Sequence, residues 1–469
     1  MKLQSSPYLS RVTPLLKRLV AALRERFPYA SVLAQDTLSM QYAVSSHGVG
    51  AIETSFLTGR GFVARVHNGH GLAEYAFNEI SEDALPALVE HISAVAESAR
   101  GEDPVPADEP AHETLNAEYE LDPDQLGTAE IVHRLTAIRE KALKTNSQLL
   151  DAGARFAWQK AHKLFLSENR ELSQSYIWTN GAILALAARG EEIKDYFESF
   201  SGLCGSELLS RLESDEAIAK ACDTAVALLD SQPIPPGEYD CICDPETTGM
   251  IVHEAFGHGV EMDMFVKDRA LAKQFMGKRV ASDLVNMHDG AAAAKECATF
   301  LFDDEGTLAQ DTRVIENGIL VAGYADAVSA ARLGVKPTGN GRRESYERKA
   351  YTRMTNTFFE GGRDKLEDMI ASIQHGYLLE NPNSGMEDPK NWGIQCMVNI
   401  AREIRDGKLT GKIFSPIVLT GYVPDLLKSI SMMSPTVELG GGGFCGKGYK
   451  EWVKVSDGGP YIKARIRLG

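Results

Sequence analysis

The stretch that decides this sequence runs His253-Glu254-Ala255-Phe256-Gly257-His258. It places two imidazoles five residues apart and a carboxylate directly after the first of them. These groups together are typical of a zinc hydrolase, in which the imidazoles hold the metal and the carboxylate takes a proton from a metal-bound water. The stretch therefore predicts a metal-binding helix around which the second half of the chain is folded.

The spacing of the two histidines has a geometric consequence. The common motif separates its histidines by four residues, which puts both rings on one face of an α-helix. A step of five residues turns about 140° beyond a full circle, so the rings of His253 and His258 would diverge on a regular helix. A π-type turn would bring them back together, and such turns are commonest at functional sites. We therefore predict that the helix widens or breaks near Gly257, the residue best able to absorb the distortion.

Three residues compete for the position of a third metal ligand. Glu261 and Asp263 lie close to the histidines in sequence, as in sites that add a downstream carboxylate. Cys445 is remote, but it follows the glycine run 440–443, which lets the backbone approach closely. A thiolate is deprotonated on zinc and binds it strongly. The residues alone leave this choice open.

Residues 253–263 resemble the signature of the metal-binding side of the TldD/PmbA family of bacterial metallopeptidases. The similarity covers nearly the whole chain. Outside the signature it is strongest in Asp303-Asp304-Glu305-Gly306, Thr338-Gly339-Asn340-Gly341-Arg342, Arg353-Met354-Thr355-Asn356-Thr357 and Phe444-Cys445-Gly446-Lys447. One departure follows the cysteine. The family pattern there is Gly-Lys-x-Gly-Gln, and this chain has Gly446-Lys447-Gly448-Tyr449-Lys450.

The resemblance implies a set of roles for the residues of the motif. His253, His258 and Cys445 would hold one zinc per chain, with Glu254 as the catalytic base. It also implies two domains, and unfolded or extended peptides as substrates. The partner would be a second copy of the chain or a paralogous PmbA/TldE-like subunit, which lacks the metal motif in this family.

Four further residues are candidates for supporting roles. With Cys445 as the third ligand, Glu261 and Asp263 remain to orient an imidazole from outside the ligand set. Asn340 and Arg342 lie in a glycine-flanked loop, where polar side chains more often serve a site than a core. We therefore predict that these two contact the substrate.

The composition excludes several classes of partner. A formal net charge of −16 over 469 residues argues against a surface for nucleic acid or for an anionic membrane. The seven cysteines show no disulfide-like spacing, which suits a reducing cytoplasm. No apolar stretch is long enough to span a bilayer. We expect a cytoplasmic protein without nucleic-acid or membrane partners.

The order of strand and helix patterns predicts an α+β fold of two domains, with mostly antiparallel sheet in each. The proline-rich segment 233–237 is the best boundary between an N-terminal α+β domain, 1–232, and a strand-rich domain, 233–469. The second domain carries the metal-binding helix. Asp244 is the expected N-cap of that helix and Pro245 its first residue.

Turn signals place other elements of the first domain. Asn68-Gly69 predicts a hairpin between two strands. Asn180-Gly181 predicts a turn between strands at 173–178 and 183–188. Residues 101–125 are rich in proline and acid, and we expect them to form an exposed connection.

Two functions follow from the pattern and the resemblance. The first is a zinc metallopeptidase that hydrolyses peptide bonds of unfolded or extended peptides, with Glu254 as general base on a zinc-bound water. The alternative is a non-catalytic subunit of a TldD/PmbA-type complex that grips extended peptides along a sheet edge. The intact Glu254 favours the enzyme, because a structural zinc needs no adjacent base and is usually closed by four protein ligands.

Overall fold

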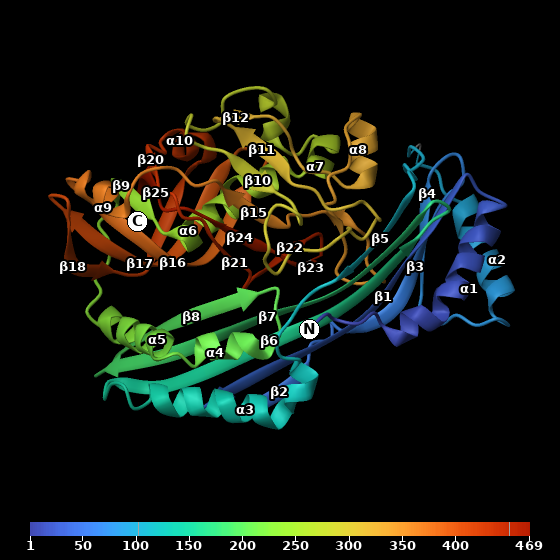
Figure 1. Ribbon diagram of the computed structural model, residues 1–469. Coiled ribbons are helices and arrows are strands. Elements are labelled where there is room, and N and C mark those ends of the chain that lie inside the picture. Colours follow the sequence, from blue (N-terminus) through green and yellow to red (C-terminus); the bar gives the residue numbers. More distant parts are fainter. Residues whose placement is uncertain (102, 450) are drawn as a thin grey trace.

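The computed structural model describes residues 1–101, 103–449 and 451–469. Figure 1 shows a long, curved sheet formed by the N-terminal half, with the C-terminal half seated against one of its faces. Helices α3, α4 and α5 lie on the opposite face of that sheet (Figure 1). No helix in the described parts of the chain is long and apolar enough to cross a membrane.

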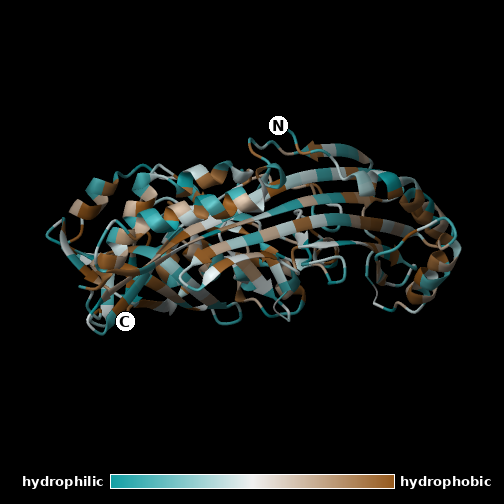
Figure 2. Ribbon diagram, turned by 90° about the horizontal axis from the view of Figure 1, so that it is seen from below, coloured by the Kyte–Doolittle hydropathy of each residue, from teal (hydrophilic) through white to brown (hydrophobic). Residues whose placement is uncertain are grey.

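The strands of the N-terminal half form one sheet in the order β4-β3-β1-β6-β7-β5, with β2 paired to β1 and β8 to β7. Their bounds are β1 Tyr29–Ser45, β2 Gly48–Glu53, β3 Gly59–His67, β4 Leu72–Phe77, β5 Ala111–Asn116, β6 Leu149–Leu166, β7 Arg170–Arg189 and β8 Glu192–Gly202. Hydrophobic and hydrophilic residues alternate along the long strands (Figure 2), because successive side chains point to opposite faces of a sheet.

Helices cover the apolar side chains of this sheet. Helices α1 and α2 pack on one end of the sheet, and α3, α4 and α5 on the face away from the C-terminal half. Their bounds are α1 Pro7–Arg24, α2 Leu85–Glu97, α3 Pro123–Ala142, η1 Ser206–Leu208, α4 Leu209–Leu212 and α5 Asp215–Leu228. The apolar faces of these helices and of the strands beneath them form two of the cores of the molecule.

The C-terminal half contains two larger sheets and two short hairpins. The first sheet has the order β16-β9-β25-β19-β17-β18, with β20 paired to β25, and the second has the order β12-β11-β10-β15-β24-β21. The hairpins are β13–β14 and β22–β23. Strand bounds are β9 Gly237–Cys243, β10 Met287–Asp289, β11 Thr312–Glu316, β12 Ile319–Leu320, β13 Gly341–Arg342, β14 Tyr351–Thr352, β15 Asn356–Phe359, β16 His375–Asp388, β17 Gly393–Arg405, β18 Lys408–Phe414, β19 Ile417–Tyr422, β20 Met432–Met433, β21 Glu438–Gly440, β22 Phe444–Lys447, β23 Glu451–Lys454, β24 Ser456–Gly459 and β25 Ile462–Leu468.

The helices of the C-terminal half are short. They are α6 Pro245–Met250, η2 Ile251–Gly257, η3 His258–Val260, α7 Met262–Val266, η4 Leu271–Phe275, α8 Ala327–Leu333, α9 Leu366–Ala371 and α10 Val423–Lys428. Phe256 from η2 is fully buried in the largest apolar core, together with side chains of both larger sheets. The helical segment with the two histidines is therefore held from several sides.

These observations confirm the predicted α+β class, with two domains and mostly antiparallel pairing. The parallel pairs among the described strands are β5–β7, β9–β16 and β15–β24. The hairpin at Asn68-Gly69 is also confirmed, since it joins β3 to β4 and Gly69 has φ +93°. The boundary between residues 232 and 233 stays a prediction. Strands up to β8 belong to the first sheet and strands from β9 onward to the others.

Two local predictions are wrong. Asn180-Gly181 forms no turn, because β7 runs through it from Arg170 to Arg189. A β-carbon on Gly181 would lie 2.5 Å from a methyl carbon of Leu212 in α4, so the glycine marks a close approach between helix and strand. The segment 101–125 is not only a connection, because it contains β5, which pairs with β7 at the sheet edge. Its residue 102 lies outside the described parts.

A loop from the C-terminal half joins the two halves through charged groups. Asp304 accepts a hydrogen bond from Lys163 of β6 at 2.5 Å, and Glu305 pairs with Arg65 of β3 at 2.6 Å. The carbonyl oxygen of Gly306 accepts a hydrogen bond from Arg170 at 2.8 Å. We call this contact between residues 303–306 and the N-terminal sheet the seam.

Candidate metal centre

The helical segment with the two histidines begins as predicted. The side chain of Asp244 accepts a hydrogen bond from the Thr247 amide at 2.7 Å, and Pro245 occupies the first helical position. The α-helix α6 then passes into a π-helix, η2, which ends at Gly257, and a 3₁₀ turn, η3, follows. The predicted widening of the helix near Gly257 is confirmed.

The π-helix brings the two imidazoles together. The ring centroids of His253 and His258 are 5.2 Å apart, and the ring planes are almost perpendicular. Cys445, delivered by β22, places its sulfur 3.4 Å from Nε2 of His258. One ligand atom from each of the three residues lies within 4.8 Å of the others. Two imidazole nitrogens and one thiol sulfur are a donor set that suits zinc.

A carboxylate lies behind each imidazole. Oε2 of Glu261 is 3.3 Å from Nδ1 of His258, so Nε2 of that ring is left for Cys445. Oδ2 of Asp457, in β24, is 3.6 Å from Nδ1 of His253. Metal-bound histidines usually have such a partner, which fixes the ring orientation and the tautomer. Glu261 therefore contacts His258 directly, whereas the contact between Asp457 and His253 is longer than a hydrogen bond, and the supporting role of Glu261 stays a prediction.

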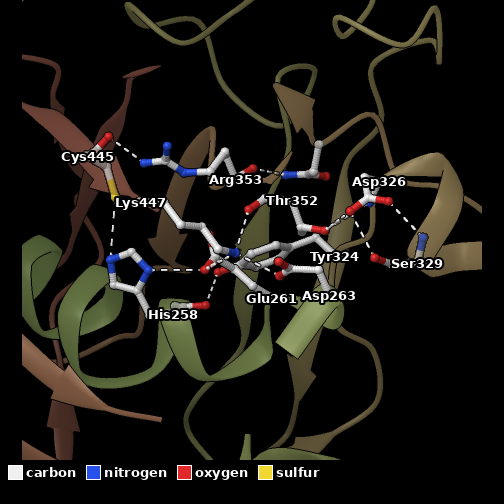
Figure 3. A network of polar contacts seen from close by, with 12 residues as sticks. His258, Glu261, Asp263, Tyr324, Asp326, Ser329, Thr352, Arg353, Cys445 and Lys447 are labelled. Carbon is white, nitrogen blue, oxygen red and sulfur yellow. Dashed lines mark hydrogen bonds and ion pairs between the residues drawn. The ribbon is translucent and has the colours of Figure 1, made fainter. Parts of the chain in front are cut away.

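A lysine holds the supporting carboxylates in place. The ammonium group of Lys447 donates to Glu261 at 2.9 Å, to Asp263 at 2.7 Å and to the carbonyl oxygen of Thr352 at 3.0 Å (Figure 3). Asp263 therefore acts on His258 only indirectly, through Lys447 and Glu261. Burial alone would raise the pKa of Glu261, but Lys447 and His258 lower it to about 2.

Two buried residues fix the backbone around the histidines and the cysteine. The guanidinium of Arg353 donates to the carbonyl oxygen of Cys445, and also to that of Glu451 at 3.1 Å. The hydroxyl of Tyr324 donates to the carbonyl oxygen of Gly257, at the end of the π-helix. Figure 3 shows Tyr324 and Arg353 around the same network. Neither contact could be read from the sequence, because each joins segments far apart in the chain.

Electrostatics favour the thiolate form of the cysteine. Burial alone would raise the pKa of Cys445, but the two nearby imidazoles outweigh it and hold the pKa well below its ordinary value. Burial lowers the pKa of His253, yet Cys445 and Asp457 raise it to about 9. The thiolate is the form that binds metals, so the cluster prepares Cys445 to act as a ligand.

Glu254 lies at the edge of the three donors. Its Oε2 is 3.9 Å from Nε2 of His258, and 24% of its side chain is exposed. A β-carbon on Gly385 of β16 would lie 2.5 Å from Cγ of Glu254, so the strand presses against the stem of this side chain. Burial raises the pKa of Glu254 above its ordinary value. The carboxylate is therefore held beside the donors while part of the side chain stays exposed.

Among the described residues, the hydrogen bonds of the two predicted substrate contacts go to groups other than the three donors. Asn340 is fully buried, and its side-chain amide donates to Asp289 at 2.6 Å and to the carbonyl oxygen of Arg353 at 2.9 Å. Arg342 donates to the carbonyl oxygen of Met354 at 2.7 Å and borders a separate cavity. The contacts of Asn340 order its loop. Substrate binding by both residues stays a prediction.

Comparison with known proteins gives three findings. Residues 236–467 match the family model described as the PmbA/TldA metallopeptidase C-terminal domain. A metalloprotease of Methanothermobacter thermautotrophicus is 31% identical over 281 residues, which are 60% of this chain and 61% of that protein. A zinc metalloprotease TldD homologue of Saccharolobus solfataricus is 28% identical over 65% of this chain and 68% of that protein.

The fold extends the likeness to the whole chain. TldE from Thermococcus kodakarensis superposes with a TM-score of 0.74 over 96% of this chain and 99% of that one, at 17% identity. The fold is therefore shared well beyond the half that carries the two histidines and Cys445. Residue 450, the last of the departure from the family pattern, lies outside the described residues, whereas Lys447 keeps its place beside Glu261. On these grounds the chain belongs to the TldD/PmbA family of metallopeptidases.

Proposed function

We propose that this chain is a zinc-dependent peptidase, with one zinc held by His253, His258 and Cys445. The observation that supports it is the convergence of these three donors, with the carboxylate of Glu254 beside them. Three protein ligands leave a fourth position free, as catalytic zinc sites require. Zinc bound there would supply Lewis acidity toward a peptide carbonyl and lower the pKa of a coordinated water.

Four side chains of the chain have separate roles in the proposed reaction. Glu254 accepts the proton of the attacking water on its accessible carboxylate and later returns it to the leaving amine. Glu261 and Asp457 hold the two imidazoles so that one nitrogen of each stays directed at Cys445. Lys447 fixes Glu261 and so has an indirect effect on ligand geometry.

We propose unfolded or extended peptides as the substrates. Strand β16 pairs with β9 only at residues 376–379, and no described strand pairs with that edge of β16 beyond them. Gly385, farther along β16, contacts Glu254. A peptide that added to this edge as a further strand would therefore pass close to the carboxylate. A folded protein could not present such a strand without local unfolding.

We also propose that the chain works as a dimer, with itself or with a PmbA/TldE-like subunit. The shared fold of this chain and TldE supports this proposal, because it lets the two kinds of subunit use similar surfaces. We place the protein in the cytoplasm, without nucleic-acid or membrane partners. The described cysteines are all unpaired, which suits a reducing compartment.

The decisive test of the peptidase is Glu254→Gln. Glutamine keeps the shape of the side chain but cannot take a proton, so turnover should fall by about a hundred- to ten-thousand-fold. Zinc content and peptide affinity should stay unchanged, because the ligands are intact. The measurements are zinc analysis, peptide binding and peptide cleavage, with and without a PmbA/TldE-like subunit.

The matched control is Glu246→Gln, an exposed glutamate of α6 in the same helical run. It should leave turnover unchanged. Full turnover by Glu254→Gln with zinc bound would remove Glu254 as the base. A wild-type protein that binds peptide but shows no turnover in either condition would favour the non-catalytic binding subunit.

A further inference from the structure

A cavity of about 60 Å³ lies at the interface between the N-terminal sheet and the C-terminal half. Its walls come mainly from β6 and β7 on one side and from β13 and β23 on the other. Figure 1 shows β22 and β23 beside the N-terminal sheet, where this contact is made. The volume is enough for a few waters or for one small ion.

Lys454 is the unusual residue of this cavity. Only 6% of it is exposed, and its Nζ has no hydrogen-bond partner and no carboxylate within ion-pair distance among the described residues. The ammonium lies 4.4 Å from the ring centre of Trp178 and 4.5 Å from that of Phe444. The ring faces offset part of the lost hydration, but they leave three N–H donors without an acceptor.

A second cation lines the same cavity. Arg342 is also buried, and no described carboxylate pairs with it. Its Nη1 donates to the carbonyl oxygen of Met354, and its guanidinium lies 5.3 Å from the ring centre of Phe300. No partner within the described residues takes the N–H groups of Nε and Nη2. Lys454 is a buried cation without a hydrogen-bond partner, and Arg342 is a buried cation with one, so the cavity is suited to binding an anion.

The acidic residues around the cavity are already engaged. Asp304 accepts from Lys163 and from the Arg343 amide. Asp303 accepts from three backbone amides, at 2.8 to 2.9 Å. Glu344 accepts from the Trp452 amide at 2.8 Å. None of these carboxylates is within ion-pair distance of Lys454 or Arg342 among the described pairs, so the two cations remain uncompensated.

We propose that this cavity binds a carboxylate, between Lys454 and Arg342. With Nη1 engaged, the guanidinium offers a fork of two N–H groups, Nε and Nη2, which matches the two oxygens of a carboxylate. The rest of the wall is mixed: the rings of Trp178, Phe300 and Phe302 suit the apolar carbon that a carboxylate carries, and polar side chains lie beside them. The carboxylates of Asp303, Asp304 and Glu344 on the same wall oppose the higher charge of a phosphate, so a singly charged anion is favoured.

The site is separate from the metal centre. In the hairpin, Phe444 lies opposite Lys454, and Cys445 lies opposite Val453. Neighbouring residues of a strand point to opposite faces, so Lys454 and Cys445 project from opposite sides of the hairpin. Carboxylate binding therefore does not depend on the proposed peptidase function, and each can be tested without the other.

The experiment measures thermal stability of the full chain in sodium acetate and in sodium chloride at equal ionic strength. Acetate should raise the melting temperature saturably, by about 1–2 °C at ten times its dissociation constant. Lys454→Met and Arg342→Gln should each weaken acetate binding by about thirtyfold or more. Lys454→Arg keeps the charge and should retain most of the effect.

Lys412→Met is the control, because Lys412 is a well-exposed lysine of β18. It should respond to acetate as the wild type does. An equal effect of acetate and chloride on the wild type would overturn the proposal. The proposal would also fail if both Lys454→Met and Arg342→Gln kept the acetate response, or if inorganic phosphate bound more tightly than acetate. Should Lys454→Met not fold, Arg342→Gln decides the matter, because an unchanged acetate response in that variant would then overturn the proposal.

Discussion

Cys445 enters the metal centre from a strand that lies far along the chain from both histidines. Its backbone carbonyl is held by Arg353 and its sulfur lies against His258, so both ends of the residue are positioned. Serine is close to cysteine in size but offers a hydroxyl, which is a poor ligand for zinc. The thiol is therefore the group on which the proposed metal affinity depends.

We expect Cys445→Ser to reduce bound zinc from about one per chain to a small fraction, because only two protein ligands remain. Elemental analysis after dialysis gives the answer. Cys204→Ser is the matched control, since Cys204 is a half-buried cysteine that contacts Thr179 rather than the histidines. Equal zinc content in the Cys445 variant and the wild type would exclude this residue from the site.

Asp457 gives a second test at the same scale. Asp457→Asn should weaken zinc binding by about ten- to a hundredfold, because an amide orients the ring of His253 less strongly than a carboxylate does. Competition with a chelator of known affinity measures the change. Asp223→Asn, on the exposed side of α5, should change nothing. An unaltered affinity in Asp457→Asn would mean that this carboxylate does not support the ring.

Some residues of the site can be identified from the sequence, and others cannot. His253, Glu254 and His258 are adjacent in the chain and form a motif whose chemistry can be read directly. Cys445 is identified only through the family resemblance, since the residues alone leave Glu261 and Asp263 as alternatives. Asp457 was missed, because a lone aspartate reaches His253 only through the tertiary fold.

At the scale of elements, the π-helix η2 is the feature that the histidine spacing demanded. Gly257 ends it, and a β-carbon there would clash with the sulfur of Met354 and lie 3.1 Å from the carbonyl oxygen of Val252. Gly257→Ala should therefore destabilise the protein by about 1–3 kcal/mol, as overpacking does. It should also weaken zinc binding, because the histidine rings move with the helix.

Thermal unfolding and zinc competition test this expectation, and a second substitution sharpens it. Met354→Ala removes the clashing side chain, so the double variant should recover part of the zinc affinity that Gly257→Ala loses. The control is Gly393→Ala, which should leave stability and zinc binding unchanged because a β-carbon on Gly393 meets no other atom and its φ is ordinary. Gly411 also has open space, but its φ of +85° would strain an alanine. Normal stability and zinc binding in Gly257→Ala would show that the glycine is dispensable.

Elements formed by local chemistry were predictable, and those decided by distant contacts were not. The N-cap at Asp244 and the hairpin at Asn68-Gly69 involve neighbouring residues, and the structure has both. Asn180-Gly181 carries the same turn signal but lies within β7. There the glycine makes room for Leu212 of a later helix, a contact that no local pattern encodes.

For the whole molecule, charged groups link the two halves beyond the loop at the seam. Glu74 of β4 accepts from Arg343 of the C-terminal half at 2.9 Å and pairs with Arg65 at 2.8 Å. Burial alone would raise the pKa of Glu74, but Arg65 and Arg343 lower it to about 2. A pKa lowered by folding means that the ionised carboxylate stabilises the folded state above the ordinary pKa near 4.5.

That stabilisation should be lost as the pH falls from about 4.5 to 2. Glu74→Gln should therefore be less stable than the wild type at pH 7, and the difference should shrink over this interval. Melting temperatures of both proteins across the range measure it. Glu82→Gln, at an exposed glutamate that pairs with the exposed Arg18, should follow the wild type throughout. A constant difference between Glu74→Gln and wild type would contradict the linkage.

The contacts at the seam also have a consequence for shortened forms of the chain. Cutting the chain at the proline-rich segment 233–237 would leave Asp304 and Glu305 on one fragment and Lys163 and Arg65 on the other. Phe302, now buried against Leu172 of the N-terminal sheet, would face water. The half with the proposed metal site is thus no self-sufficient module that could be transplanted onto another scaffold. Recombination or engineering that moves it must carry the N-terminal sheet along with it.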